Sequence, residues 1–178
     1  MPRYLALFGS INVGGNRLKM ADLRAAFEAE GFTNVETVVA SGNVLFDHPE
    51  RPVDGLEEKL SLMMRHRFGM NSVALVRSRD ALAAVIAENP FGADGQENFV
   101  HTLFLDGPVD PKGFARLEAD HTGPERLAAG DRALHIDYVA GAGESKLVGQ
   151  FIERRLGCKG TARNLRSMKR ILAKMDES

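Results

Sequence analysis

The order of apolar patterns along the chain is the feature that most constrains its fold. Short runs rich in β-branched and aromatic residues, typical of strands, alternate with longer runs whose apolar residues recur every three or four positions, typical of helices. Strands are predicted first at Tyr4–Phe8, Val35–Ala40, Val44–Phe46 and Ser72–Val76. A first helix ends at Gly31, and a second carries its apolar residues at Leu56, Leu60, Met63, Met64 and Phe68. This βαββαβ order is that of ferredoxin-like domains.

The same order begins again after a connecting segment. A helix at Ser78–Asn89, with Ser78 as its cap, is followed by a polar, Gly-containing loop at Phe91–Asn98. The next elements are predicted at Thr102–Leu105, Pro111–His121, Glu125–Ala128, Ala133–Val139 and Ser145–Leu156. No final strand is visible, and a C-terminal helix from about Arg163 to Met175 takes its place. We therefore predict an α+β protein of two ferredoxin-like subdomains, residues 1–92 and 93–178, the second ending in a basic helix.

Composition excludes several classes of protein. No stretch approaches the roughly 20 apolar residues of a membrane helix, so no membrane partner is expected and a cytoplasmic location is predicted. Cys158 is the only cysteine, which rules out an intrachain disulfide and a cysteine-based zinc site. The histidines show no metal-ligand spacing, and neither a metal nor a cofactor is expected. His135 and Asp137 share one strand face and are interpreted as exposed polar neighbours.

The net charge of −1 hides an uneven distribution. From Ser145 onward nine basic residues stand against three acidic ones, a net charge of +6, so the preceding part carries −7. In the predicted C-terminal helix the cations recur at three- and four-residue steps, at Arg163, Arg166, Arg170 and Lys174. Such a stripe can follow the phosphates of a nucleic acid, or it can be a solvated helix face that pairs with the acidic remainder.

A Gly-rich segment, Gly9–Met20, joins the first strand to the first helix. Gly9 and Gly14 match the first half of a Walker A loop, but Gly15 and Asn16 stand where that loop requires Lys and Ser or Thr. This substitution argues against nucleoside-triphosphate chemistry. The backbone N–H groups at the helix start, with Arg17 and Lys19 nearby, are still suited to hold a phosphate or carboxylate. Alternatively, the glycines only permit a tight turn whose backbone Asn12 and Asn16 bond.

A second Gly-rich turn, Gly141–Lys146, lies in the other half. Ser145 is interpreted as the N-cap of the following helix. Lys146 would then stand in the first turn, against the helix dipole, where a bound anion would relieve an unfavourable placement.

Several motifs together resemble a bacterial family, the domain-of-unknown-function family 1697. They are Ile11-Asn12-Val13-Gly14-Gly15 with Lys19-Met20, Ser41-Gly42-Asn43-Val44, Asn89-Pro90-Phe91, Tyr138 with Gly141-x-Gly143-x-Ser145-Lys146-Leu147, and Thr161-Ala162-Arg163-Asn164. The resemblance implies a pair of ferredoxin-like subdomains and supplies no reaction. The chain departs from the family pattern in Gly9-Ser10, where relatives have Arg-Gly, and in Leu165, where relatives have Trp.

These observations predict a protein that binds a small anionic ligand, such as a nucleotide. The predicted ligand-binding residues are Asn12, Gly14, Gly15, Lys19, Asn43, Ser145, Lys146, Arg163 and Asn164. Two other classes stay open. One is a nucleic-acid-binding module that uses Arg163, Arg166, Arg170 and Lys174, and the other is an interaction subunit that forms oligomers along its sheets. No motif identifies a catalytic residue, and whether the protein is an enzyme is left open.

Overall fold

The computed structural model describes residues 1–9, 18–39, 42–143 and 145–177. By its internal contacts the chain divides into two compact units. Unit 1 comprises Met1–Leu82 and Arg170–Ser178, and unit 2 comprises Ala83–Lys169. The C-terminal segment therefore returns to the first unit. The division between residues 92 and 93 into two subdomains stays a prediction.

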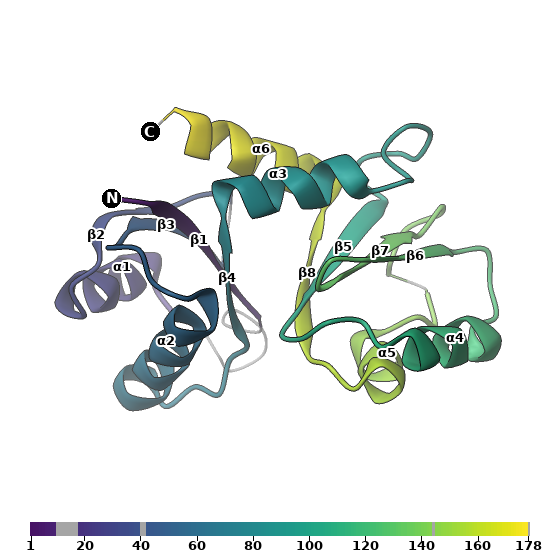
Figure 1. Ribbon diagram of the computed structural model, residues 1–178, viewed down its shortest axis with the longest axis horizontal. Helices are drawn as coiled ribbons and strands as arrows, with labels where there is room; N and C mark the ends of the chain where they lie inside the picture. The colour runs from purple at the N-terminus through teal and green to yellow at the C-terminus, as the bar shows by residue number, and fades with distance from the viewer. Residues whose placement is uncertain (10–17, 40–41, 144, 178) are drawn as a thin grey trace. The chain divides into compact units, whose positions relative to one another are not determined.

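Unit 1 is built on a four-stranded antiparallel sheet, sheet A, with the order β2-β3-β1-β4. Its elements are β1 (Arg3–Phe8), α1 (Met20–Ala29), β2 (Thr33–Thr37), β3 (Asn43–Asp47), α2 (Val53–Phe68) and β4 (Ala74–Ser78). Figure 1 shows α1 and α2 on the same side of this sheet. The predicted βαββαβ order is confirmed. Each helix joins two strands that follow one another in the sequence but are not adjacent in the sheet, α1 joining β1 to β2 and α2 joining β3 to β4.

Unit 2 repeats the arrangement in sheet B, with the order β6-β7-β5-β8. Its elements are β5 (Val100–Leu105), α4 (Pro111–Asp120), β6 (Arg126–Gly130), β7 (Ala133–Asp137), α5 (Gly149–Leu156) and β8 (Gly160–Asn164). The helix α3 (Arg79–Glu88) connects the two sheets along the chain, and α6 (Leu165–Asp176) ends it. The N-cap prediction for α3 is confirmed, because the Ser78 hydroxyl accepts a hydrogen bond from the backbone N–H of Ala81 at 3.1 Å.

Two predictions for the second half were wrong. The final strand exists as β8, and α6 begins only at Leu165, so Arg163 lies on a strand. The strand was missed because only Thr161 of its five residues is buried, which leaves no apolar alternation to detect. The helix α5 begins at Gly149, with Val148 as its N-cap, so Ser145 and Lys146 precede it.

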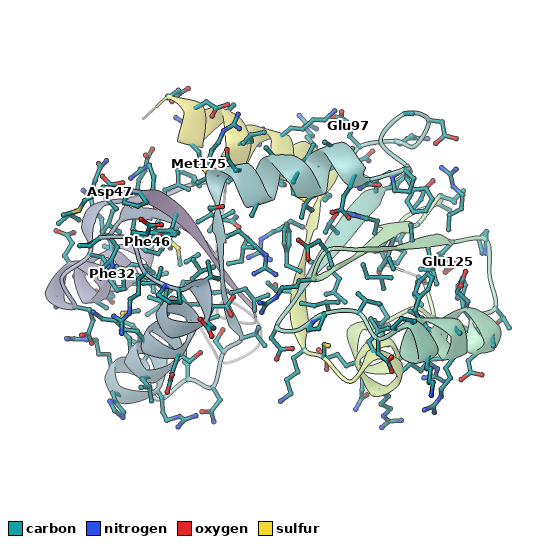
Figure 2. The ribbon with its side chains drawn as sticks, viewed as in Figure 1. Phe32, Phe46, Asp47, Glu97, Glu125 and Met175 are labelled. Atoms are coloured by element: carbon teal, nitrogen blue, oxygen red, sulfur yellow. The ribbon has the colours of Figure 1, made fainter. Side chains whose placement is uncertain are left out.

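The core of unit 1 lies between sheet A and its two helices. Alternate residues of β1 and β3 face α1 and α2, and a cluster of rings fills the space between them. Phe32 packs edge-on against Phe46 with ring centroids 4.8 Å apart, and Phe27 lies 5.6 Å from Phe46 (Figure 2). Each such aromatic side chain contributes about 1.5–3 kcal/mol by leaving water. The predicted α2 stripe is confirmed, since its four buried residues are Leu56, Leu60, Met63 and Met64.

The core of unit 2 lies between one face of sheet B and the pair α4 and α5. Leu103, Leu134 and Ile136 face the helices and pack with residues such as Leu117 and Ile152. The two helices approach closely where α4 has a glycine, Gly113. A Cβ on that residue would lie 2.5 Å from the carbonyl oxygen of Arg155 on α5.

The opposite faces of both sheets are also buried. In sheet A this face carries Leu5 and Leu7, which have no exposed surface. In sheet B it carries polar residues, among them His135 and Asp137, which are 0% and 4% exposed. The prediction that His135 and Asp137 are exposed neighbours was therefore wrong. A strand that alternates apolar with polar residues is typical of a sheet with one solvated face. At His135 and Asp137, however, the polar face of sheet B is not exposed to solvent.

Candidate functional site

Three segments of unit 1 meet at the end of β1, where the Gly-rich segment begins. The backbone N–H of Phe8 donates to the carbonyl of Gly42 at 2.8 Å, and that of Gly9 donates to Val73 at 3.1 Å. The Ser72 hydroxyl donates to the carbonyl of Gly9. The turn before β3, the start of β4 and the beginning of the β1–α1 connection thus lie together at one end of the strands of sheet A. We call this place the β1 edge.

Two of the predicted ligand-binding residues, Lys19 and Asn43, stand at the start of elements whose preceding connections start or end at the β1 edge. Lys19 is the N-cap of α1, with extended φ and ψ of −71° and 135°, and its exposed side chain makes no capping hydrogen bond. Asn43 pairs with Leu7 across the sheet and is 2% exposed. Its side-chain amide donates to the carbonyl of Val39 at 2.9 Å, which holds the turn before β3. Asn12, Gly14 and Gly15 lie outside the described residues.

The second Gly-rich turn is organised around a carboxylate. The Ser145 hydroxyl donates to Glu125 at 2.5 Å and accepts the backbone N–H of Leu147 at 3.0 Å. Burial raises the pKa of Glu125, but the Ser145 hydrogen bond, together with a backbone bond and the charge of His121, outweighs it and leaves the pKa below its usual value. A negative charge therefore already occupies this turn. Because Ser145 is no N-cap and exposed Lys146 is outside the first turn of α5, the dipole argument for Lys146 does not hold.

The two Gly-rich turns occupy different positions in the repeated topology. The first follows the first strand of its sheet, whereas the second follows the third strand of the other, β7. First and third strands are antiparallel neighbours in both sheets, so these turns lie at opposite ends of their respective sheets.

Arg163 and Asn164 lie at the end of β8 and have partners within unit 2. The Arg163 guanidinium donates to the Thr161 hydroxyl at 2.7 Å and to the Ala162 carbonyl at 2.9 Å. Burial lowers the pKa of Arg163 to about 10. The Asn164 side chain accepts the backbone N–H of Ser167 at 2.8 Å and so caps α6. Asn164 therefore has a structural role, whatever else it contacts.

The exposed cations of α6 are partly neutralised by carboxylates. Lys169 pairs with Glu97, and Lys174 lies 3.5 Å from Glu177. The remaining exposed cations of the helix are Arg166 and Arg170. The opposite stripe of α6 is buried and consists of Leu165, Met168, Ile171 and Met175.

A chain of polar side chains that the sequence did not indicate crosses sheet B. Thr102 on β5 lies 2.8 Å from Nδ1 of His135 on β7, and Nε2 of His135 lies 2.9 Å from a carboxylate oxygen of Glu88 on α3. The order hydroxyl, imidazole, carboxylate is that of a catalytic triad. Thr102 and His135 are both 0% exposed, so no substrate reaches the hydroxyl and the chain serves to join α3 to the sheet. His135 is 33 residues from Thr102 and 47 residues from Glu88, so the three residues form no local sequence motif.

Within residues 1–9, 18–39, 42–143 and 145–177, no group of three or more His, Cys, Asp or Glu residues is arranged to hold a metal ion. No helix in the same ranges is long and apolar enough to cross a membrane.

Sheet orders, crossovers and antiparallel pairing place the chain among proteins that duplicate the ferredoxin-like βαββαβ domain. The chain belongs to the family described as "Protein of unknown function (DUF1697)", whose model matches residues 1–135. The resembling motifs from Tyr138 to Asn164 lie beyond that match. The chain is also similar to the conserved bacterial protein SP0830 from Streptococcus pneumoniae, with a TM-score of 0.79 and 23% identity over 100% of this chain and 99% of that one. That likeness shows the shared fold. No curated protein matches the chain.

Proposed function

We propose that the protein binds a small ligand carrying a phosphate or carboxylate group at the β1 edge. Lys19 carries this proposal. Its side chain is exposed, and no carboxylate among the described residues pairs with it. It stands at the amino end of α1, where the helix dipole disfavours a positive charge by about 0.3–1 kcal/mol. Asp22, in the first turn of α1, offsets part of this effect. An anion here would interact favourably with both the ammonium group and the helix.

The neighbouring backbone supports the same proposal. The β1–α1 connection begins at a glycine whose carbonyl and N–H are both bonded, to Ser72 and Val73, so the start of the segment is held in place. We expect the remaining contacts with the ligand to come from Asn12, Gly14, Gly15 and the turn at Asn43. Backbone N–H groups that follow a strand and open a helix are a common anion-binding arrangement.

The proposal centres on unit 1 because the candidates of unit 2 have other partners. Ser145 is bonded to Glu125, and Asn164 caps α6. A carboxylate beside Ser145 repels a second anion. Lys146 and Arg163 stay predicted contacts within unit 2, to be tested separately from Lys19.

The test is a thermal-unfolding series with inorganic phosphate, a nucleoside monophosphate, a nucleoside triphosphate and citrate. A ligand at 100 times its Kd stabilises the native state by about 2.7 kcal/mol, which raises the Tm measurably. We expect Lys19→Ala to reduce that rise. Lys112→Ala is the matched control, because Lys112 is also an exposed lysine in a first helical turn but its helix is capped by Asp110. Unchanged Tm with all four compounds, or an equal effect of Lys112→Ala, contradicts the proposal.

Nucleic-acid binding by α6 is the second candidate, favoured by Arg166 and Arg170. These exposed residues are four positions apart and have no carboxylate partner among the described residues. Arg163 does not contribute to this helix face, since it lies on β8. An RNA affinity that falls steeply with salt, and that is lost in Arg166→Ala with Arg170→Ala, would establish this function instead.

A further inference from the structure

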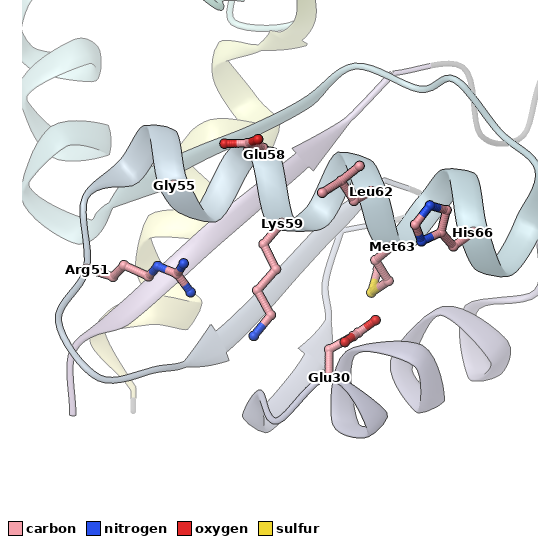
Figure 3. A pocket seen from close by; sticks show the side chains of 8 residues that line it. All are labelled: Glu30, Arg51, Gly55, Glu58, Lys59, Leu62, Met63 and His66. Atoms are coloured by element: carbon pink, nitrogen blue, oxygen red, sulfur yellow. The ribbon is translucent and has the colours of Figure 1, made fainter.

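A hollow of about 440 Å³ runs along one side of α2 in unit 1, and we call it the α2 groove (Figure 3). Its volume is in the range of sites for small organic molecules. Leu62 and Met63 line its middle, and Leu62 is 42% exposed, although large apolar side chains are mostly buried in this chain. An apolar surface inside a hollow favours a ligand with an apolar part.

One end of the α2 groove is cationic. Arg51, just before the helix, and Lys59, on its second turn, extend from the same side of α2 in Figure 3, whereas Glu58 points away from them. Neither Arg51 nor Lys59 pairs with a carboxylate among the described residues. The Lys59 ammonium lies 5.0 Å from the centre of the Phe32 ring, which holds it by a cation–π contact.

The acidic residues of the groove do not cancel these charges. Glu30, at the end of α1, is paired with Arg67 at 3.3 Å. His66 lines the end of the groove away from Arg51, where Glu30 also lies, and it adds no negative charge (Figure 3). Glu58 also lines the groove, so among its described lining residues Arg51 and Lys59 are the two lysine or arginine residues and Glu58 is the one carboxylate besides the paired Glu30.

A helical glycine keeps the cationic end open. Gly55 lies in the first turn of α2 and lines the groove. A Cβ there would lie 3.5 Å from Nε of Arg51, an ordinary contact, but a longer side chain would fill the space beside the guanidinium. A side chain longer than that of alanine at this position would therefore reduce access to Arg51.

We propose that the α2 groove binds an amphipathic organic anion. Arg51 and Lys59 hold its carboxylate, phosphate or sulfonate group, and Leu62 and Met63 contact its apolar body. The site is separate from the β1 edge. Since β3 is antiparallel to β1, with Arg3 opposite Asp47, the end of β3 that leads into Arg51 lies at the other end of sheet A.

The probe for this site is 8-anilinonaphthalene-1-sulfonate, followed by its fluorescence and by shifts of the Leu62 and Met63 methyl signals. Its uncharged counterpart is N-phenyl-1-naphthylamine. We expect Arg51→Ala with Lys59→Ala to weaken binding of the sulfonate by about tenfold, the effect of losing a charge-assisted hydrogen bond, and to leave the uncharged probe unaffected. Leu62→Ser and Gly55→Leu should weaken binding of both probes. Leu62 is exposed and leucine favours helices, so both variants are expected to fold.

The matched control is Lys112→Ala with Arg116→Ala, which removes two exposed cations from α4 in unit 2. An equal loss in this control would overturn the proposal, since it would show a general charge effect. Displacement of the sulfonate probe by the same concentration of inorganic sulfate would also overturn it, because no apolar contact would then be needed. Lys19→Ala should leave probe binding unchanged, so failure at the β1 edge and failure at the α2 groove are distinguishable.

Discussion

Gly130, the last residue of β6, lies against the bond between Glu88 and His135. A Cβ on Gly130 would overlap the Glu88 carboxylate and come within 2.7 Å of Nε2 of His135. Gly130→Ala must therefore move Glu88 away from the imidazole. The overlapping atom is the end of a flexible side chain, so the cost is the lost bond rather than a shift of the backbone.

The magnitude follows from the groups involved. A hydrogen bond to a charged group contributes about 1.5–3 kcal/mol, and the 30% exposure of Glu88 places this one at the low end because water screens it. Replacing glycine by alanine in a compatible conformation also stabilises the protein by about 0.4–1 kcal/mol, because it lowers the conformational entropy of the unfolded chain. We expect a net loss of about 1 kcal/mol, or a Tm lower by about 2–4 °C for a chain of this size.

The assay is urea unfolding of Gly130→Ala, Glu88→Ala and the double variant. Once Glu88 is absent the methyl group no longer overlaps a carboxylate and meets only Nε2 of His135, at 2.7 Å, so Gly130→Ala should cost less in that background than in the unaltered protein. The control is Gly149→Ala, at the exposed start of α5, where a Cβ meets no atom within 4 Å and a small gain is expected. Additive effects of the two substitutions, or equal stability of Gly130→Ala and Gly149→Ala, would refute the reasoning.

Three other outcomes are expected. Gly113→Ala should lower the free energy of unfolding by about 1–3 kcal/mol in urea, because its Cβ would lie 2.5 Å from the backbone carbonyl of Arg155 and force α4 from α5. Burial lowers the pKa of His101, so the unfolded chain takes up the proton first and stability falls as pH drops below about 6.5. His101→Phe should reduce that fall in unfolding curves measured from pH 7 to 5, and an unchanged pH profile would contradict the assignment. Asn164→Ala should cost about 1 kcal/mol by removing the cap on Ser167, whereas Asn164→Ser should restore most of it in the same thermal assay.

Much of the fold was predictable because apolar periodicity reports which side of an element faces the core. The stripe of α2 follows this rule. The strand β1 was recognisable instead as a short continuous apolar run, and its residues are buried on both faces of sheet A. The strand β8 shows neither pattern, since its pairing with β5 depends on backbone hydrogen bonds that any residues can make. The start of α5 was misplaced for a related reason: Ser145 has the chemistry of an N-cap, but its hydroxyl is bonded to Glu125, twenty residues earlier.

The candidate sites were predictable only in part. Lys19 and Asn43 were found from a Gly-rich connection and a turn, both of which are local patterns. The cationic end of the α2 groove was not found, because Arg51 and Lys59 are exposed charges of an ordinary kind in the sequence. Their significance comes from the neighbouring hollow and from Phe32, which reaches Lys59 from outside the helix.

The sequence by itself determined the repeated order of strands and helices apart from β8, the buried stripe of α2, and the absence of an intrachain disulfide. Those properties depend on spacing within single elements and on cysteine count. Only the tertiary structure decided that His135 is buried between Thr102 and Glu88, and that Arg51 and Lys59 share one groove. Such associations join residues far apart in the chain, and they are set by strand register and helix packing, which no local spacing records.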